Sequence, residues 1–540
     1  MPAVRRRALA FAARFVTADS QSAAPAAATA PAGPLSDVVA GSVAARALAV
    51  ALLAVAIALG AWLRFAGAGA REMSADEGAS WAAAAAPSLA QVVRIQAVLN
   101  PGKLAVYEIL LHGWMRLFGD GLGAMRALSA MLDTFGIVVV FALVRELFVA
   151  QPSVPQGEGV VFGGVPSAEA ETVAALAALF FAVNLVTIKY ARELRMYPLA
   201  LLIVLLQVWF FVRAVRRGCL FDLAPLALLT ALAVAAHFSA AFVVVAEAGC
   251  LPVLPPPPRR ARTLWVTPRL AIVAALGAGA MLFLFLALPA LRTGASAFAN
   301  GATAWIERPR WWAPLTLFNK AVGTFAFPVM AALAGWGAWR GWVRARAAVT
   351  FALAWMWLPP LMMLVASYAF SPMFVERYAL WCFVPFFALA AFGAWELRVA
   401  SIRGVTLGAV GTLGAVGLSV ALALGHIHAY RRRPHDTQWR EAVRAAADAL
   451  APGMKIAVAP PYAVNAVRYY LRGTSAAGAA VPANDSDAGN SDAEILVVGD
   501  QWNAREKAAK LLARFPHPLA GFRGVRVCGR GARGRTVNRR

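Results

Sequence analysis

The chain has 540 residues, of which 61% are hydrophobic and only 14% are charged, whereas a soluble domain has about 25% charged residues. Apolar runs of about 20 residues recur along it, which excludes a soluble globular protein and indicates a polytopic membrane protein. The net charge of +24 comes largely from arginines in short tracts between the apolar runs. Because no basic module interleaved with aromatic residues is evident, we expect no nucleic-acid partner.

Residues 1–42 begin with several arginines and continue as a tract rich in Ala, Pro, Ser and Thr. This composition predicts a disordered cytoplasmic tail. The first apolar segment, Val43–Leu63, starts too late and is too long for the apolar region of a cleaved signal peptide.

Residues 43–429 are predicted to form an α-helical transmembrane domain with 11 full spans, 12 or 13 being the alternatives. Leu104–Phe118 is too short for a full span, so we expect it to cross only partly or to lie along the membrane interface. The full spans are predicted at Val43–Leu63, Ala124–Phe148, Val173–Lys189, Met196–Val212, Leu223–Ala236, Ala240–Leu254, Leu270–Leu291, Leu315–Trp339, Ala347–Tyr368, Tyr378–Leu397 and Val405–His426.

Arginine-rich loops follow Val212, Leu254, Trp339 and Leu397. Because cytoplasmic loops carry an excess of Lys and Arg, we place these four loops in the cytoplasm. The intervening loops then share the opposite side. They are residues 64–103, 190–196, 237, 292–310 and 371–377, and residues 430–540 fall on that side as well.

The acidic pair Asp76 and Glu77 lies in the first of these external loops, within Met73–Trp81. Carboxylates at a membrane edge are energetically costly and therefore point to a function. The alternative is that both are ordinary solvated loop residues, which is the usual reading of charged runs.

Residues 430–540 have the alternating helix and strand pattern of a small α/β domain with a parallel sheet. We expect Thr474–Asp492 to be a flexible polar loop. The four cysteines are scattered without metal-ligand spacing, so neither a disulfide framework nor a zinc site is indicated. Helices are predicted at Gln438–Leu450, Val464–Leu471 and Asn503–Phe515, and strands at Lys455–Ala459, Glu494–Val498 and Gly524–Cys528.

Short motifs stand out at Met73–Trp81, Asn100–Phe118, Tyr190–Tyr197 (YARELRMY), the surroundings of His237, Glu376–Tyr378, Gln438–Arg440 and Arg468–Leu471. Together they resemble motifs of bacterial GT-C glycosyltransferases related to protein O-mannosyltransferases and lipid A aminoarabinose transferases (the family 39-like group). The resemblance covers about residues 43–530. Asn100 stands where many relatives have histidine, and Arg192 replaces a glutamine-like position.

The resemblance implies transfer of a sugar from a polyprenyl-phosphate donor to a lipid, glycan or protein acceptor at the outer face of a bacterial inner membrane. Such an acceptor loses a proton as it attacks, and a placed carboxylate can take it. Asp76 is the predicted catalytic base or acceptor-orienting group, and Glu77 is predicted to help position Asp76 or to share a cation with it.

The leaving lipid phosphate needs a cation, for which a guanidinium is well suited. Arg377 is our first choice for this contact, and Lys103 and Arg195 are the second choices. The remaining predicted substrate-binding residues are Tyr197, His237, Glu376 and Tyr378.

Three further questions stay open at this level. A divalent metal would use Asp76 and Glu77, because hard cations favour carboxylate oxygens, but no DxD-like set of ligands requires one. The pair of Glu193 and Arg195 is read equally well as structural or functional, whereas His112, Glu108 and Asp133 read better as helix-packing groups. The alternative functions are a flippase or transporter for a lipid-linked glycan and a non-catalytic membrane assembly protein.

Overall fold

The protein is described by a computed structural model that covers residues 35–150, 164–256, 267–299, 305–402, 405–432, 437–483, 493–499 and 505–531. The chain divides into two compact units, Met1–Ala44 and Ala45–Arg540. Residues 1–34 of the predicted cytoplasmic tail lie outside the described part. Residues 35–42 are not loop but the beginning of the first long helix, α2 (Leu35–Phe65).

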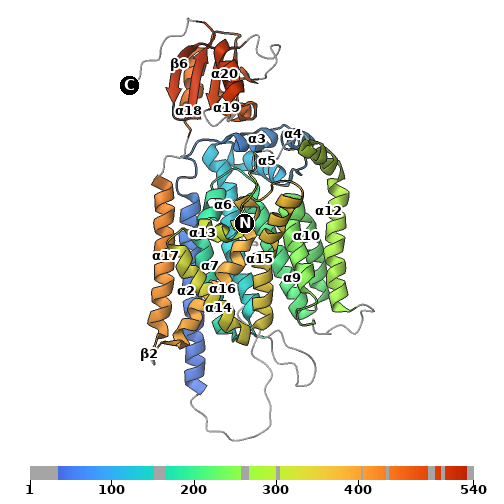
Figure 1. Ribbon diagram of the computed structural model, residues 1–540, viewed down its shortest axis with the longest axis vertical. Helices are drawn as coiled ribbons and strands as arrows, with labels where there is room; N and C mark the ends of the chain where they lie inside the picture. Colours follow the sequence, from blue (N-terminus) through green and yellow to red (C-terminus); the bar gives the residue numbers. More distant parts are fainter. Residues whose placement is uncertain are drawn as a thin grey trace, which may run out of the picture. The chain divides into compact units, whose positions relative to one another are not determined.

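Seven helices in the described residues are long and apolar enough to cross a bilayer, which confirms the predicted class of multi-pass helical membrane protein. Figure 1 shows them running side by side as one bundle. They are α2, α6 (Leu122–Phe148), α9 (Tyr197–Arg217), α12 (Pro268–Ala299), α15 (Arg346–Ala369), α16 (Phe383–Glu396) with its flanking turns, and α17 (Gly408–Arg432).

Two of the predicted spans are broken rather than straight. α7 (Ser167–Ala182) and α8 (Leu185–Ala191) meet at 61°, and α13 (Ala313–Val322) and α14 (Ala326–Arg344) meet at 111°. Asn184 caps the start of α8, because its side chain accepts hydrogen bonds from the next turn's N–H groups. Counting each broken pair as one span gives nine.

Two other predicted spans form short apolar helices, α10 (Leu223–Ala236) and α11 (Ala241–Cys250). With their flanking turns they cover Leu220–Ala236 and Phe238–Cys250, which are shorter than the seven long spans. The described residues thus hold up to nine spans by length, and these two short apolar helices occupy the two remaining predicted positions. His237 and a short 3-10 turn separate the two helices. α10 nevertheless packs between α9 and α12 within the bundle.

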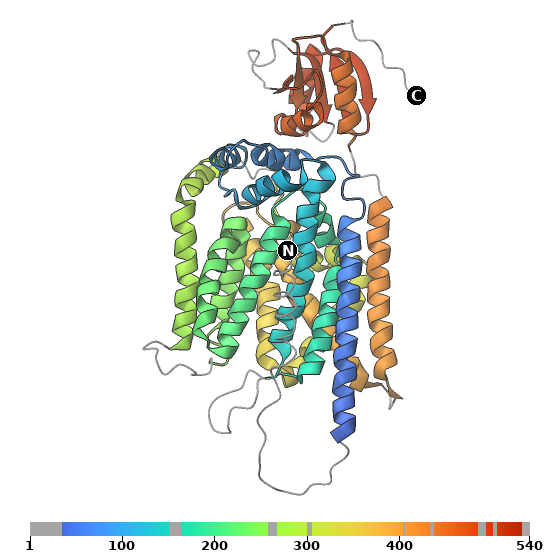
Figure 2. The same ribbon diagram turned by 180° about the vertical axis from the view of Figure 1, so that it is seen from behind.

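The external loop 64–103 folds into helices rather than extended chain. α3 (Ala75–Ala84), α4 (Leu89–Leu99) and α5 (Val106–Phe118) lie across one end of the bundle in both views (Figures 1 and 2). α5 corresponds to the predicted short segment Leu104–Phe118 and does not qualify as a span. α3 begins with a capping box, in which Ser74 and Glu77 satisfy each other's backbone N–H groups.

The arginines that we assigned to the cytoplasmic side meet carboxylates at the other end of the bundle. Glu169 at the start of α7 pairs with Arg344 at 3.2 Å and with Arg398 at 3.0 Å. Glu396 at the end of α16 pairs with Arg340 at 3.1 Å. These pairs join three helix ends that are distant in sequence.

α14 and α16 cross at a contact that only glycine permits. A Cβ atom added to Gly337 would lie 2.0 Å from the Leu389 carbonyl oxygen, and one added to Gly393 would lie 1.9 Å from the Leu333 carbonyl oxygen. Small residues allow such close approach of helix backbones in membranes. The backbone that follows Arg377 into α16 is therefore held tightly against α14.

The C-terminal domain has a five-stranded sheet of order β4-β3-β5-β7-β6. The first three strands are parallel, but β7 pairs antiparallel with β5 and β6 pairs antiparallel with β7, so the predicted parallel sheet is wrong in its second half. β4 also lies inside the predicted loop Thr474–Asp492. The elements are α18 (Trp439–Ala449), β3 (Lys455–Ala459), α19 (Val464–Leu471), β4 (Ala480–Pro482), β5 (Ala493–Gly499), α20 (Arg505–Arg514), β6 (His517–Phe522) and β7 (Val525–Gly529).

Candidate active site

Asp76 lies at the start of α3 and points its carboxylate outward. The side chain is 63% exposed, and its Oδ2 lies 3.7 Å from Nη2 of the buried Arg195. Arg195 also donates a hydrogen bond of 3.0 Å to the Asp76 carbonyl oxygen. The Arg195 guanidinium holds the pKa of the Asp76 carboxyl below its ordinary value in spite of partial burial, and Arg377 and Lys103 act in the same direction. Asp76 is therefore ionised at neutral pH.

Lys103, Arg195 and Arg377, the three candidates for the phosphate contact, all lie close enough to Asp76 to influence its charge. Burial, reinforced by the charge of Arg195, lowers the pKa of Lys103 to about 8. Gly102 precedes it with a φ of +85°, and a Cβ atom there would lie 2.9 Å from the Gly294 Cα atom. Glycine at this turn thus lets the loop carrying Lys103 pass close to the end of α12.

Three aromatic rings surround Arg377, the third cation of this group. The Arg377 guanidinium lies 5.8 Å from the Tyr197 ring centroid, 5.6 Å from that of Tyr378 and 5.1 Å from that of Trp305. The His237 ring lies 4.6 Å from the Tyr378 ring and 5.8 Å from the Tyr197 ring. Cation–π contacts of this kind orient a guanidinium without using its hydrogen-bond donors. Trp305 of the loop before α13 belongs to this group as well.

Glu77 has a different environment from its neighbour Asp76. It forms a two-pronged ion pair with Arg126 of α6, with both N–O distances at 2.8 Å and both side chains 2% exposed. Its oxygens also accept hydrogen bonds of 2.8 Å from the backbone N–H groups of Ser74 and Leu194. Burial alone would raise the pKa of Glu77, but these partners keep it below its ordinary value.

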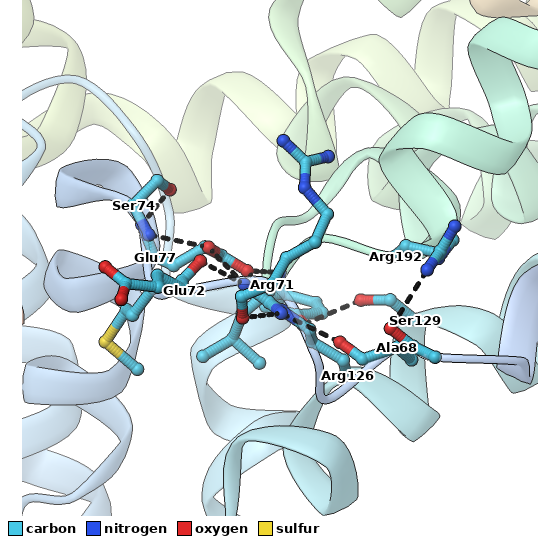
Figure 3. Close-up of polar contacts among 12 residues, drawn as sticks. Ala68, Arg71, Glu72, Ser74, Glu77, Arg126, Ser129 and Arg192 are labelled. Atoms are coloured by element: carbon cyan, nitrogen blue, oxygen red, sulfur yellow. Dashed lines mark hydrogen bonds and ion pairs between the residues drawn. The ribbon is translucent and has the colours of Figure 1, made fainter. Parts of the chain in front are cut away.

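Arg126 completes this closed network by binding backbone carbonyls of the external loop. It donates to the carbonyl oxygens of Ala68 (2.8 Å), Arg71 (2.7 Å) and Glu72 (2.8 Å), as Figure 3 shows. All the donors of its guanidinium are thereby occupied. Glu77 is enclosed as well, so its geometry fits the first of the two predicted roles, positioning Asp76, better than the second, sharing a cation.

Two other carboxylates near the cluster were not assigned a function from the sequence. Glu108 of α5 is buried and accepts a hydrogen bond of 3.2 Å from Ser80, and burial raises its pKa. Glu193 was predicted to pair with Arg195, but Arg195 pairs with Asp76 instead. Burial beside Glu77 raises the pKa of Glu193 to about 7. Neither environment leaves a signal in the local sequence.

Glu376 and Arg377 are consecutive but have separate contacts. Glu376 pairs with Lys189 at 3.4 Å and with Lys320 at 3.1 Å, and the Tyr190 hydroxyl donates to it at 3.3 Å. The Tyr190 ring lies 5.0 Å from the ring of Tyr197, which in turn contacts Arg377 of the Asp76 group. The structure thus brings together all the predicted site residues except Glu77 and Glu376, which lie beside the exposed cluster.

The C-terminal domain contacts the loop that carries Asp76. The Met73 backbone N–H donates a 2.6 Å hydrogen bond to the Tyr470 hydroxyl, and the Trp81 and Tyr469 rings meet edge to face at 5.3 Å. A Cβ atom at Gly78 would lie 2.5 Å from the Ala466 backbone nitrogen, so α3 and α19 touch directly. The predicted motif Arg468–Leu471 therefore supports the loop through its two tyrosines.

The described residues contain no group of three or more His, Cys, Asp or Glu side chains arranged to hold a metal ion. Of the two predicted ligands, Glu77 is enclosed by Arg126, and Asp76 is surrounded by three cations. These surroundings favour an anionic ligand and do not fit a divalent cation. No step of the mechanism proposed below passes through a metal.

No family model and no curated protein sequence matches the chain. Among solved structures it is similar to ArnT from Cupriavidus metallidurans bound to undecaprenyl phosphate, with 13% identity, coverage of 89% of this chain and 98% of that one, and a TM-score of 0.55. It is also similar to the oligosaccharyltransferase AglB from Archaeoglobus fulgidus in complex with an inhibitory peptide and a dolichol-phosphate, with 10% identity, coverage of 88% and 74%, and a TM-score of 0.50. Both are GT-C glycosyltransferases, and the chain has their fold.

The clamp between Glu77 and Arg126 predicts a large loss of stability when one partner is removed. Arg126→Met leaves a buried carboxylate unpaired, and we expect the free energy of unfolding to fall by about 3–5 kcal/mol. Unfolding in detergent measures it. Arg126→Met combined with Glu77→Met should recover most of the loss, and Arg116→Met on the exposed side of α5 should change little. A loss below about 1 kcal/mol for Arg126→Met would contradict a tightly held pair.

The contact between the external loop and the C-terminal domain is predicted to depend on pH. Glu72 accepts a hydrogen bond from the Arg440 backbone N–H at 3.1 Å. Burial and a carboxyl–carboxyl hydrogen bond to Glu441 raise the pKa of Glu72 from 4.5 to about 7. The folded state therefore binds more protons than the unfolded state between these values, so stability falls as pH rises from 4.5 to about 7.

Thermal unfolding in this pH range tests the contact. The melting temperature of the wild type should fall as pH rises, and Glu72→Gln, which keeps a hydrogen-bonding group without a titration, should flatten that part of the slope. Glu494→Gln is the matched control in the same domain. An unchanged slope in Glu72→Gln would show that other groups carry the pH dependence.

Proposed function

We propose that this multi-pass membrane protein is a glycosyltransferase that moves a sugar from a polyprenyl-phosphate donor to a lipid, glycan or protein acceptor. The observation that carries the proposal is the exposed carboxylate of Asp76 among three cations, Lys103, Arg195 and Arg377. The GT-C fold supports it, as do the undecaprenyl phosphate bound to ArnT and the dolichol-phosphate bound to AglB.

The three cations suit the donor's leaving group. A sugar–phosphodiester carries one negative charge, and a second develops on the phosphate as its bond to the anomeric carbon breaks. Cations fixed in place before the reaction stabilise that new charge without reorganising. Arg377 is well placed for a two-pronged contact, because its aromatic neighbours leave its N–H donors available.

Asp76 serves the acceptor in this scheme. The acceptor oxygen forms the bond to the anomeric carbon, the bond from that carbon to the phosphate oxygen breaks, and the acceptor proton passes to the Asp76 carboxylate. Asp76 is ionised and largely exposed, which the proton transfer requires. Its lowered pKa makes it a weak base, so orienting the attacking group is an equal part of its role.

We place this site at the periplasmic face of a bacterial inner membrane. The support is the distribution of charge along the bundle. The Asp76 loop and the C-terminal domain share one end, and arginines from loops that were assigned to the cytoplasm meet Glu169 and Glu396 at the other. That asymmetry follows the rule that cytoplasmic loops are positively charged.

Asp76→Asn should lower sugar transfer by about 10²–10⁴-fold, the range for losing a general base, while expression and membrane insertion stay normal. The assay is transfer from a radiolabelled polyprenyl-phosphate sugar in proteoliposomes, with Asp448→Asn on the exposed side of α18 as the control. Wild-type turnover in Asp76→Asn would remove Asp76 from the mechanism. Transbilayer movement of the donor without transfer by the wild-type protein would favour the flippase alternative.

Arg377→Lys should keep the positive charge but lose the two-pronged geometry, so donor affinity and turnover fall together. Arg377→Ala should be worse, by about 2–5 kcal/mol in transition-state stabilisation, as for truncation of a desolvated charge pair. Donor-dependence kinetics for both variants measure this. Full activity in Arg377→Lys would mean that the residue acts only as a membrane anchor, and the phosphate contact would then be assigned to Lys103 or Arg195.

A further inference from the structure

Beside the Asp76 cluster lies a second polar site that the proposed reaction does not use. It is a cavity of about 260 Å³ between α8, α13 and α17. Its polar lining includes Lys189, Lys320, Glu376, Asn319, His426 and Tyr430, and its apolar lining includes Leu185 and Val186. The lining therefore combines a charged group with an apolar wall.

The charges in this cavity do not balance. Glu376 is 20% exposed and bridges the two ammonium groups, with Lys189 at 3.4 Å and Lys320 at 3.1 Å. One carboxylate between two cations leaves an excess of one positive charge. Both lysines retain access to solvent or ligand, with side chains 31% and 60% exposed. A ligand with a single negative charge neutralises the group.

The side-chain amide oxygen of Asn319 adds a second requirement, a hydrogen-bond donor on the ligand. Its Oδ1 atom is buried and makes no hydrogen bond with the described protein atoms. A buried acceptor without a partner is costly, so a ligand hydroxyl at this position would be favourable. The turn beside it is shaped by Gly323, which has a φ of +91° and whose Cβ atom would lie 2.5 Å from the His426 ring.

The surroundings of the cavity indicate where the ligand comes from. Only 22% of the residues in the most apolar stretch of α17 are buried against the rest of the protein, so most of this helix faces away from the bundle. Leu185 and Val186 belong to α8, the second half of a broken span. A molecule with an acyl chain would reach the cavity from the bilayer, its chain along the apolar wall and its headgroup at the lysines.

We propose that this cavity binds the headgroup of an anionic amphiphile, a phosphodiester with one negative charge and at least one hydroxyl group. Its phosphate lies between Lys189 and Lys320, and its hydroxyl group donates to Asn319 Oδ1. The chemistry is that of a phospholipid such as phosphatidylglycerol. The proposal does not depend on the sugar-transfer activity, because it concerns binding alone.

The test is a titration of purified full-length protein in neutral detergent with dioleoylphosphatidylglycerol, read as the melting temperature. We expect a saturable rise for the wild type and for the exposed control Arg94→Gln, and no rise with dioleoylphosphatidylcholine. In Lys189→Gln with Lys320→Gln, apparent affinity should be at least about tenfold weaker, since one charge-assisted hydrogen bond is worth roughly 1.5–3 kcal/mol.

The double variant leaves Glu376 without its cations, so a triple variant that adds Glu376→Gln guards against misfolding and should show the same loss of affinity. A parallel titration uses inorganic phosphate in place of the phospholipid. Saturable, lysine-dependent stabilisation by inorganic phosphate but not by the phospholipid would overturn the lipid assignment. Equal stabilisation of the wild type and of a folded lysine variant by phosphatidylglycerol would overturn the site itself.

Discussion

The buried ion pair between Glu77 and Arg126 is the constraint on which the exposed site depends. Successive residues of an α-helix point about 100° apart, so fixing Glu77 inward against α6 turns Asp76 outward. The same pair joins the loop before α3 to the turn after α8, because Glu77 also accepts from the Leu194 N–H. That turn carries Arg195, the residue paired with Asp76. One interaction thus positions both the exposed Asp76 and its buried partner Arg195.

At this end of the bundle, the role of each carboxylate depends on whether its side chain is buried and paired or exposed. Glu77 is neutralised by Arg126 and Glu376 by two lysines. Asp76, in contrast to these two, faces outward, where three cations lower its pKa. The C-terminal domain, through Tyr470 and α19, covers the loop from the other side. A positive site with one ionised carboxylate results, and this combination suits an anionic donor together with a neutral nucleophile.

Periodicity and composition predicted most of the fold because they report local properties. β3 and α19 have the predicted bounds, and the loops carrying Asp76, Lys103, Arg195 and Arg377 do meet. What the sequence could not reveal depends on partners far along the chain. Arg126 is 49 residues from Glu77, and nothing in its helix marks it as a clamp. The separate contacts of Glu376 and Arg377, the broken spans and the antiparallel half of the sheet likewise depend on tertiary contacts.

The glycine crossing of α14 and α16 has a consequence for motion. Backbone in contact with backbone has no side chains that could repack, so these two helices cannot slide past each other without a clash between Gly337 and Leu389. The segment bearing Arg377 leads directly into α16, and we therefore expect it to be the rigid side of the site. If the entrance to the site widens for a bulky molecule, the movement must occur on the opposite side. That side is the layer formed by α3, α4 and the C-terminal domain. Because the Glu77–Arg126 pair holds α3 against α6, the part of that layer left to move is the C-terminal domain, whose contacts with the loop include the Met73–Tyr470 hydrogen bond.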